Sequence, residues 1–261
     1  MWTSGTYRTG FAPRDGSPAY PSLWRGCVRA YYTGLGPTGL TLRDWSGRHK
    51  HGSITAAAGF GYHVESGRYT LSGSTDWTGS IVDCGDRIGL TDVTSVFAWA
   101  NPTTTTGFQQ IAGERNGSNR NWQFRTSSGK LSILYLVGSI TSGTDMPLDR
   151  MSCVGFTFQN GASELFENGS SVGTTTGCTI GTNTLNFEIG NNTIPHPWSG
   201  GIQEVRIYNR VLSRNEIMIL SRRPGIAYEL APRRRVGVTD AATFLPSWVI
   251  RQNVLIGGGL Q

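Results

Sequence analysis

The segment GGIQEVRIYNRVLSRNEIMIL, residues 200–220, decides the fold. Its first half alternates, so that a β-strand places Val205 and Ile207 on one face and the residues between them on the other. In its second half, Ser213 and Glu216 form the capping-box pattern that begins a short helix. The segment therefore predicts a core strand of a sandwich, followed directly by a short helix.

Turn signals divide the preceding residues into further short strands. MSCVGFTFQNGASELFENGSSVG contains two Asn-Gly dipeptides, at 160–161 and 168–169, flanked by alternating apolar residues, a pattern typical of type I′ hairpins. CVRAYYTG and TSVFAWANP predict strands, the second with Phe97 and Trp99 on one face. A turn signal roughly every eight to twelve residues favours an all-β sandwich or barrel.

Four of these elements together resemble the laminin G-like, concanavalin A-like jelly-roll modules, of the kind found in phage structural proteins. They appear in the order typical of that family, and they are LRDWSGRHKHGSI (42–54), VFAWANP (96–102), GFTFQNGASELFENGSSVG (155–173) and the segment 200–220. The resemblance covers about residues 27–220 and implies two antiparallel sheets packed face to face. It leaves residues 1–26 as an N-terminal arm and residues 221–261 as a basic and apolar C-terminal tail.

The positive charge of the chain lies mainly in this tail. The net charge is +6, and from Ser221 onward six arginines against Glu229 and Asp240 give +4, which leaves +2 for residues 1–220. A nearly neutral body argues against nucleic-acid binding. No run of 18 apolar residues predicts a membrane span, and the first residues contain no apolar stretch of the secretory type.

The sequence also argues against an enzyme. Glu164 and Glu167 are the only acids close together in a predicted strand, and their spacing sends them to opposite faces, whereas a retaining glycosidase needs both in one cleft. No nucleophile motif is present. The four cysteines form no C-x-x-C pair, which favours buried free thiols over a zinc site or disulfides.

Two sets of binding residues are candidates. The resemblance implies a structural calcium ion held by oxygen ligands, for which Asp44 and Glu204 are the candidate ligands, although Gln203 stands where the family often has Asp. Asp44 alternatively caps its own turn. Rim loops would bind a glycan, with Trp122, Trp198, Asn191 and Asn192 as its contacts; Trp198 alternatively plugs the end of the sandwich.

We expect from the resemblance a non-enzymatic virion structural protein, in a capsid decoration, fibre or tail. The jelly roll would be a knob that recognises cell-surface glycans, made in the host cytoplasm and docked to other virion proteins, or to copies of itself in a homo-oligomer, through its terminal segments. The docking residues expected in the tail are Tyr228, Leu230, Arg233, Arg234, Arg235, Phe244 and Trp248. Two alternatives stay open: an extracellular carbohydrate-binding or adhesion module of a bacterial surface, and a glycan-active hydrolase.

Overall fold

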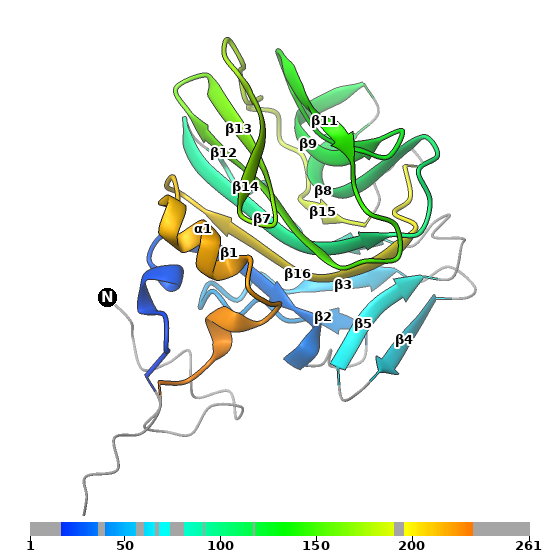
Figure 1. Ribbon diagram of the computed structural model, residues 1–261, viewed down its shortest axis with the longest axis vertical. Coiled ribbons are helices and arrows are strands. Elements are labelled where there is room, and N and C mark those ends of the chain that lie inside the picture. The colour runs from blue at the N-terminus through cyan, green and yellow to red at the C-terminus, as the bar shows by residue number, and fades with distance from the viewer. Residues whose placement is uncertain are drawn as a thin grey trace, which may run out of the picture. The chain divides into compact units, whose positions relative to one another are not determined.

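Two antiparallel sheets, packed face to face, form the body of the protein in a computed structural model (Figure 1). Each sheet has eight strands within the described residues. The described residues are 17–35, 40–55, 60–65, 68–73, 81–90, 92–116, 118–190 and 196–231. The predicted all-β jelly-roll sandwich with one short α-helix is confirmed.

The first sheet contains the segment that decides the fold. Its strand order is β14 (Ser170–Thr175), β13 (Ala162–Glu167), β12 (Ser152–Gln159), β7 (Val93–Pro102), β16 (Gly200–Tyr208), β5 (Arg68–Gly73) and β4 (Phe60–Glu65), with β1 (Cys27–Tyr32) also pairing with β16. The hairpin turns have the predicted type I′ chemistry, because Asn160 and Gly161 have φ of 48° and 83°, and Asn168 and Gly169 have φ of 48° and 85°.

The second sheet contains the strands that later form the candidate site. Its order is β11 (Ser139–Asp145), β10 (Lys130–Tyr135), β9 (Asn119–Ser127), β8 (Phe108–Asn116), β15 (Glu188–Ile189), β6 (Ile81–Asp83), β3 (Gly52–Thr55) and β2 (Thr41–Leu42). Since β15 joins β8 to β6, it brings residues that are about a hundred positions apart in the chain into one hydrogen-bonded ladder.

Aromatic side chains fill the space between the two sheets. Trp122 stacks on Phe187 with ring centroids 5.9 Å apart, and Phe124 meets Phe156 edge to face at 5.5 Å. Val205 and Ile207 of β16 belong to the same buried cluster, as the alternation predicts. At about 25 cal/mol per Å² of buried apolar area, this cluster is the main source of the stability of the sandwich.

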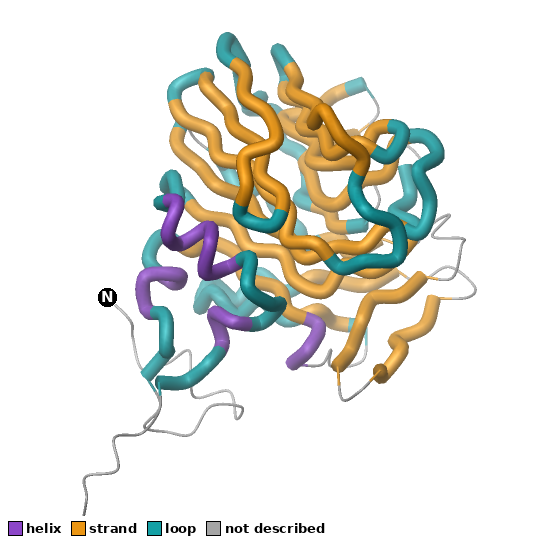
Figure 2. The backbone as a smooth tube through the Cα atoms, in the orientation of Figure 1, coloured by secondary structure: helices purple, strands orange, loops and turns teal. Residues whose placement is uncertain are grey.

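Helical segments cover the outer face of the first sheet. They are α1 (Arg214–Leu220) and the 3₁₀ helices η2 (Pro21–Trp24) and η4 (Ile226–Tyr228), which Figure 2 shows in purple on one side of the strands; η3 (Thr33–Leu35) follows β1. Phe97 and Trp99 point to this side and form a second apolar cluster with Ile217 and Leu220 of α1. These segments therefore cover the part of the outer face where Phe97 and Trp99 lie.

One arginine connects the parts of this cover. Arg206 on β16 is 1% exposed, donates to the Leu23 carbonyl at 3.0 Å, and reaches Glu204 at 3.5 Å. Its guanidinium also lies 4.2 Å from the ring centroid of Trp24 and 5.2 Å from that of Tyr228. A charge with so little exposure survives only with such partners.

The boundary predicted after residue 220 is wrong. The first compact unit ends at Leu230, since Ile226 and Ala227 are 2% and 0% exposed and Pro18 bridges Leu230 in an antiparallel ladder. Residues 17–26, expected in an arm, also pack on the body through the buried Leu23. Residues 1–16 of the expected arm and residues 232–261 of the expected tail lie outside the described residues.

The four cysteines are free and buried, as predicted. Burial raises the pKa of the Cys27 thiol to about 11 and that of Cys153 to about 12. Among the described residues, no helix has the length and apolarity required to cross a bilayer.

Candidate functional site

The outer face of the second sheet carries polar side chains where the first sheet carries apolar ones. On β9, Trp122 and Phe124 point into the core, so Gln123 and Arg125 point to the outer face. On β15 and its preceding residue, Phe187 and Ile189 belong to the core, which places Glu188 on that same outer face. This face contains no apolar cluster comparable to the one under α1 within the described residues.

A hydrogen-bonded group of amides and guanidiniums occupies the centre of this face. Gln123 donates through Nε2 to Oε1 of Gln110 at 2.9 Å, and both side chains are 0% exposed. The Oε1 atom of Gln123 accepts from Arg115 at 2.6 Å and from Arg125 at 3.3 Å. Two positive charges thus converge on one neutral oxygen.

Gly113 on β8 keeps this group close to the sheet. A Cβ atom at this position would lie 3.0 Å from the Trp122 carbonyl oxygen and 3.1 Å from the Cα of Gln123. Gly113 pairs with Gln123 on one side and with Glu188 on the other. Because Gly113 has no side chain, the Gln110 amide lies close above it, with Oε1 3.5 Å from the position that a Cβ would take.

An aromatic ring lies at the edge of the same face. Phe108 is 44% exposed, the guanidinium carbon of Arg125 lies 4.1 Å from its ring centroid, and His196 meets it edge to face at 5.5 Å. Partial burial, together with the neighbouring charges of Arg115 and Arg120, lowers the pKa of Arg125 to about 10. An exposed ring beside convergent polar groups is typical of a ligand site.

Two carboxyls lie on the same outer face, on the side of β8 away from β9. Asp83 on β6 and Glu188 on β15 stand directly opposite one another, a position in which Cβ atoms are about 5 Å apart. Glu188 is 6% exposed, and its Oε2 atom has no hydrogen-bond partner. Burial, and then the charge of Asp83, raise the pKa of Glu188 to about 7. Asp83 accepts hydrogen bonds from the Gly85 N–H at 2.8 Å and from Asn186.

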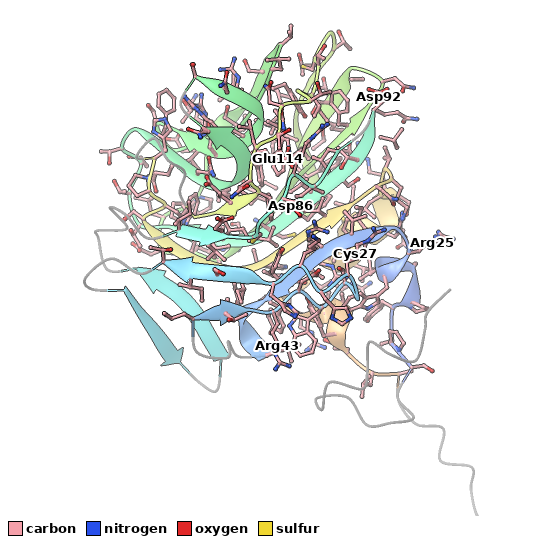
Figure 3. All side chains as sticks on the ribbon, turned by 180° about the vertical axis from the view of Figure 1, so that it is seen from behind. Arg25, Cys27, Arg43, Asp86, Asp92 and Glu114 are labelled. Carbon is pink, nitrogen blue, oxygen red and sulfur yellow. The ribbon has the colours of Figure 1, made fainter. Side chains whose placement is uncertain are left out.

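Glu114, a second buried acid of the same sheet, differs from Glu188 because both of its carboxyl oxygens have hydrogen-bond donors. It lies on β8 (Figure 3) and is 0% exposed, but its two oxygens accept from the Ile88 N–H at 2.6 Å and from the Asn121 amide at 2.8 Å. Burial raises its pKa, while these two bonds oppose the effect. Glu188 differs because one of its oxygens is left without a donor. We call the group of Gln110, Arg115, Gln123, Arg125, Asp83 and Glu188 the outer-face site.

The glycan contacts predicted from the sequence are not part of this site. Trp122 and Trp198 are both 0% exposed and pack in the core, so neither ring can stack on a sugar, and this prediction is wrong. The alternative for Trp198, that it plugs the sandwich, agrees with its burial and with its hydrogen bond to the Gly201 carbonyl at 3.3 Å. Asn191 and Asn192 lie outside the described residues.

The predicted calcium ligands do not fit a calcium site. Asp44 already accepts from the N–H groups of Ala30, Ser46 and Lys50 at 2.9–3.1 Å, so it caps its turn as the alternative interpretation states. Glu204 accepts from the Gly225 N–H at 2.7 Å and pairs with Arg206. Donors therefore occupy both carboxylates, and calcium needs six to eight oxygen ligands. No group of three or more His, Cys, Asp or Glu gathers in the part of the chain that the structure describes.

The two docking residues inside the described part of the chain have partners within the protein. Tyr228 stacks on Tyr32 with ring centroids 5.0 Å apart, and Leu230 bridges Pro18. Tyr228 is therefore a residue of the cover on the first sheet. The other predicted docking residues, which are Arg233, Arg234, Arg235, Phe244 and Trp248, lie outside the described residues.

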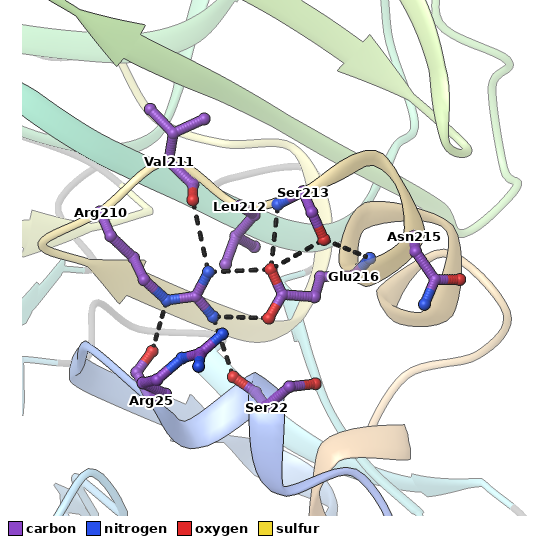
Figure 4. Close-up of a pocket in the computed structure, with 8 residues that line it drawn as sticks. All are labelled: Ser22, Arg25, Arg210, Val211, Leu212, Ser213, Asn215 and Glu216. Atoms are coloured by element: carbon purple, nitrogen blue, oxygen red, sulfur yellow. Dashed lines mark hydrogen bonds and ion pairs between the residues drawn. The ribbon is translucent and has the colours of Figure 1, made fainter.

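A depression elsewhere on the surface lies between η2 and the start of α1, and its polar groups are already paired (Figure 4). Arg210 binds both oxygens of Glu216, at 2.7 and 2.8 Å, and donates to the carbonyls of Ser22 and Arg25. Ser213 and Glu216 form the predicted capping box. These interactions join α1 to η2, and the depression offers a ligand few unpaired donors or acceptors.

Comparison with known proteins gives one family match and several structural ones. The family model Laminin_G_3, described as the concanavalin A-like lectin/glucanases superfamily, matches residues 66–218. No curated protein sequence matches the chain.

The solved structures that resemble it include lectin-like parts of enzymes and a toxin. Domain 4 of AbnA, a GH43 extracellular arabinanase from Geobacillus stearothermophilus solved with arabinotriose, has a TM-score of 0.60 and 18% identity over 75% of this chain and 98% of that domain. The sialidase of Trypanosoma rangeli has a TM-score of 0.56 and 14% identity over 74% of this chain and 32% of the sialidase. The binding domain of botulinum neurotoxin serotype D has a TM-score of 0.58 and 16% identity over 78% of this chain and 52% of that domain. At such identities the likeness is one of fold.

Proposed function

The chain belongs to the Laminin_G_3 family of the concanavalin A-like lectin/glucanases superfamily, and on that premise we propose that it is a carbohydrate-binding module whose ligand site is the outer-face site. The family match includes every residue of this site. Domain 4 of AbnA, which shares the fold, was solved with a trisaccharide bound. The proposal concerns the place and the chemistry of binding in this chain.

The observation that supports the proposal is the contrast between the two outer faces. Apolar side chains and α1 cover the first sheet, whereas the second sheet holds buried amides, half-buried guanidiniums and a carboxyl with an unpaired oxygen. A buried polar atom without a partner costs about 1–3 kcal/mol, so a sheet that needed only stability would not keep Glu188. A sugar offers hydroxyls that both donate and accept, and it would satisfy this oxygen.

The site also has the composition that a sugar requires. The half-buried Arg115 and Arg125, held in place by the buried Gln123 amide, present guanidinium donors in fixed planes, and Phe108 presents an exposed ring at the edge. Hydroxyls bind to such planar groups, and the apolar face of a pyranose packs on a ring. The arrangement therefore fits a sugar unit packed on Phe108 and bound by the neighbouring Arg125.

A glycan array with matched variants tests this assignment. We expect the full chain to bind at least one glycan, and Gln123→Ala to weaken that binding about tenfold or more, because it removes the amide that holds Arg115 and Arg125 in place. Gln159→Ala removes the same side chain from an exposed position at the end of β12 and serves as the control. Glu188→Gln, which is isosteric, provides a second variant if Gln123→Ala does not fold. Absence of binding to any glycan, or equal binding by all four proteins, contradicts the proposal.

Glycan hydrolysis is a second candidate, because of the acid pair that the strand order creates. Asp83 and Glu188 face the same side of adjacent strands, and retaining glycosidases need two carboxyls about 5 Å apart. A carboxyl with a pKa of about 7 is about half protonated at neutral pH, and this suits a general acid. Chromatography of array-positive glycans after incubation would detect products. If products form and Asp83→Asn abolishes them, the protein is an enzyme; if none form, it is a binding module.

We retain the virion role as a proposal, together with its docking through the terminal segments and its alternative on a cell surface. The relevant comparison is between the full chain and a chain that ends at Leu230, because the first compact unit extends to that residue. Light scattering and co-sedimentation with candidate particles would measure assembly. If residues 231–261 act in docking, the shorter chain loses assembly and keeps glycan binding. If both chains are equally monomeric and neither binds particles, the docking role fails.

A further inference from the structure

Three arginines lie on β8 and β9, and two of them, Arg115 and Arg125, belong to the outer-face site. Arg115 and Arg120 are direct cross-strand partners, and Arg125 follows on the same strand as Arg120. Like charges directly opposite one another destabilise an antiparallel pair. All three side chains are half-buried, so water screens their repulsion less than on an open surface.

Arg120 and Arg125 donate to neutral acceptors in the structure. Arg115 and Arg125 share Oε1 of Gln123, and Arg120 donates through Nε to the Tyr135 carbonyl at 2.6 Å. The Nε atom of Arg125 is buried and has no hydrogen-bond partner. None of the ion pairs within the described residues involves Arg120 or Arg125. Neither of these two charges has an anion beside it.

The nearby acids do not supply that anion. Burial and the charge of Asp83 account for the raised pKa of Glu188, and no arginine opposes them. In the same way, burial and other arginines account for the lowered pKa of Arg125, and no carboxylate opposes them. The site thus has an acidic end at Asp83 and Glu188 and a basic end at Arg115 and Arg125, and the two ends do not neutralise one another.

We propose that the basic end of the outer-face site binds the carboxylate of an acidic sugar, a uronic or sialic acid residue, between Arg115 and Arg125. The inference rests on the proposed glycan-binding function and narrows its ligand class. The planar fork of a guanidinium matches a carboxylate, and charge-assisted bonds of this kind are about twice as strong as neutral ones. The exposed ring of Phe108 under Arg125 gives the sugar ring a surface that a free inorganic anion would not use.

Nucleic acid is the other polyanion that arginines commonly bind, and the charge of the body disfavours it. Residues 1–220 have a net charge of only +2, whereas a surface that follows a phosphate backbone needs a basic stripe. Arg115 and Arg125 converge on one amide oxygen within a single pair of strands, and Arg120 lies opposite Arg115 near the end of that pair. One carboxylate per binding site fits this arrangement.

Paired charged and neutral glycans test the inference by isothermal titration calorimetry on the full chain. The probes are a hyaluronan oligosaccharide with its carboxyl-reduced form, sialyllactose with lactose, and sulfated dextran with dextran. We expect the carboxylated member of the first or the second pair to bind about 10- to 100-fold more tightly than its neutral form. The first pair reports on uronic acids and the second on sialic acids.

Two arginine variants locate the effect. Arg125→Gln should remove the preference for the carboxylated member and leave weak binding of the neutral one. Arg214→Gln is the matched control, because Arg214 also stacks on a phenylalanine, with its guanidinium carbon 4.8 Å from the ring centroid of Phe166, but it lies on α1 over the first sheet. Arg115→Gln replaces Arg125→Gln if the latter unfolds, which a thermal melt would show.

The outcomes separate this inference from the proposed function. Equal affinity for the charged and neutral members of the first two pairs overturns the inference and leaves glycan binding intact. Binding of sulfated dextran alone, or an equal loss in Arg214→Gln, also overturns it, since either result indicates diffuse charge attraction. Absence of binding to every probe and to the wider array removes the proposed function itself.

Discussion

Glu188→Gln should make the protein more stable, and more so as the pH rises. The pKa of this buried carboxyl rises from its ordinary value of 4.5 to about 7, and each tenfold change in proton affinity corresponds to 1.36 kcal/mol. Below pH 4.5 both the folded and the unfolded chain hold the proton, so Glu188 has no effect. Between pH 4.5 and about 7 only the unfolded chain releases it, and stability falls. Above about pH 7 the cost reaches up to about 3 kcal/mol.

Urea unfolding at a series of pH values measures this cost. The difference in unfolding free energy between Glu188→Gln and the wild-type chain should be near zero at pH 4 and grow to between about 1 and 3 kcal/mol at pH 8. Asp83→Asn should lower the cost in part, because Asp83 is the second cause of the raised pKa. Asp86→Asn, in which the lost carboxylate is 82% exposed, controls for the loss of one charge. A difference that stays constant from pH 4 to 8 would refute the reasoning.

Three further predictions concern the rest of the fold. Arg206→Ala should destabilise the protein by about 3–5 kcal/mol in urea unfolding, because it leaves the Glu204 carboxylate buried without its charged partner; a loss below about 1 kcal/mol would contradict this. Glu216→Ala should lower the unfolding free energy by about 1–2 kcal/mol, because it removes the helix cap and the ion pair with Arg210. These bonds lower the pKa of Glu216. Thermal melts should therefore show the loss of stability at pH 7 and its decline as the pH falls through that pKa. The four buried thiols should react with a thiol reagent at pH 8 only after urea is added, so rapid labelling of the native chain would contradict their burial.

Local patterns predicted the elements of this fold because each depends on neighbours in the chain. The Asn-Gly turns need positive φ at both positions, which few other residue pairs adopt readily. The capping box at Ser213 and Glu216 lies within a single helical turn. The alternation in β7 correctly placed Phe97 and Trp99 together on one face, and that face is buried under α1.

The site was beyond the reach of local patterns because it depends on the order of the strands. Asp83 and Glu188 lie opposite one another because β15 pairs with β6, and no periodicity in the sequence predicts that pairing. The alternation of Trp122, Gln123, Phe124 and Arg125 does indicate a polar face, and it was the available signal for half of the site. Their position near loops suggested Trp122 and Trp198 as ligand contacts. Burial of a large aromatic ring in the core is strongly stabilising, and a position near a loop does not indicate whether the ring is buried.

The pairing of residues 18–19 with residues 229–230 has a consequence for how this module combines with other polypeptides. Ala19 donates its N–H to the Glu229 carbonyl at 2.7 Å, and Pro18 bridges Leu230, so the chain enters and leaves the sandwich at a single point. A domain whose entry and exit coincide can be inserted into a surface loop of a carrier protein without stretching that loop. A module inserted in this way would join the carrier protein at Pro18 and Leu230. The outer face of its second sheet would stay available for a ligand.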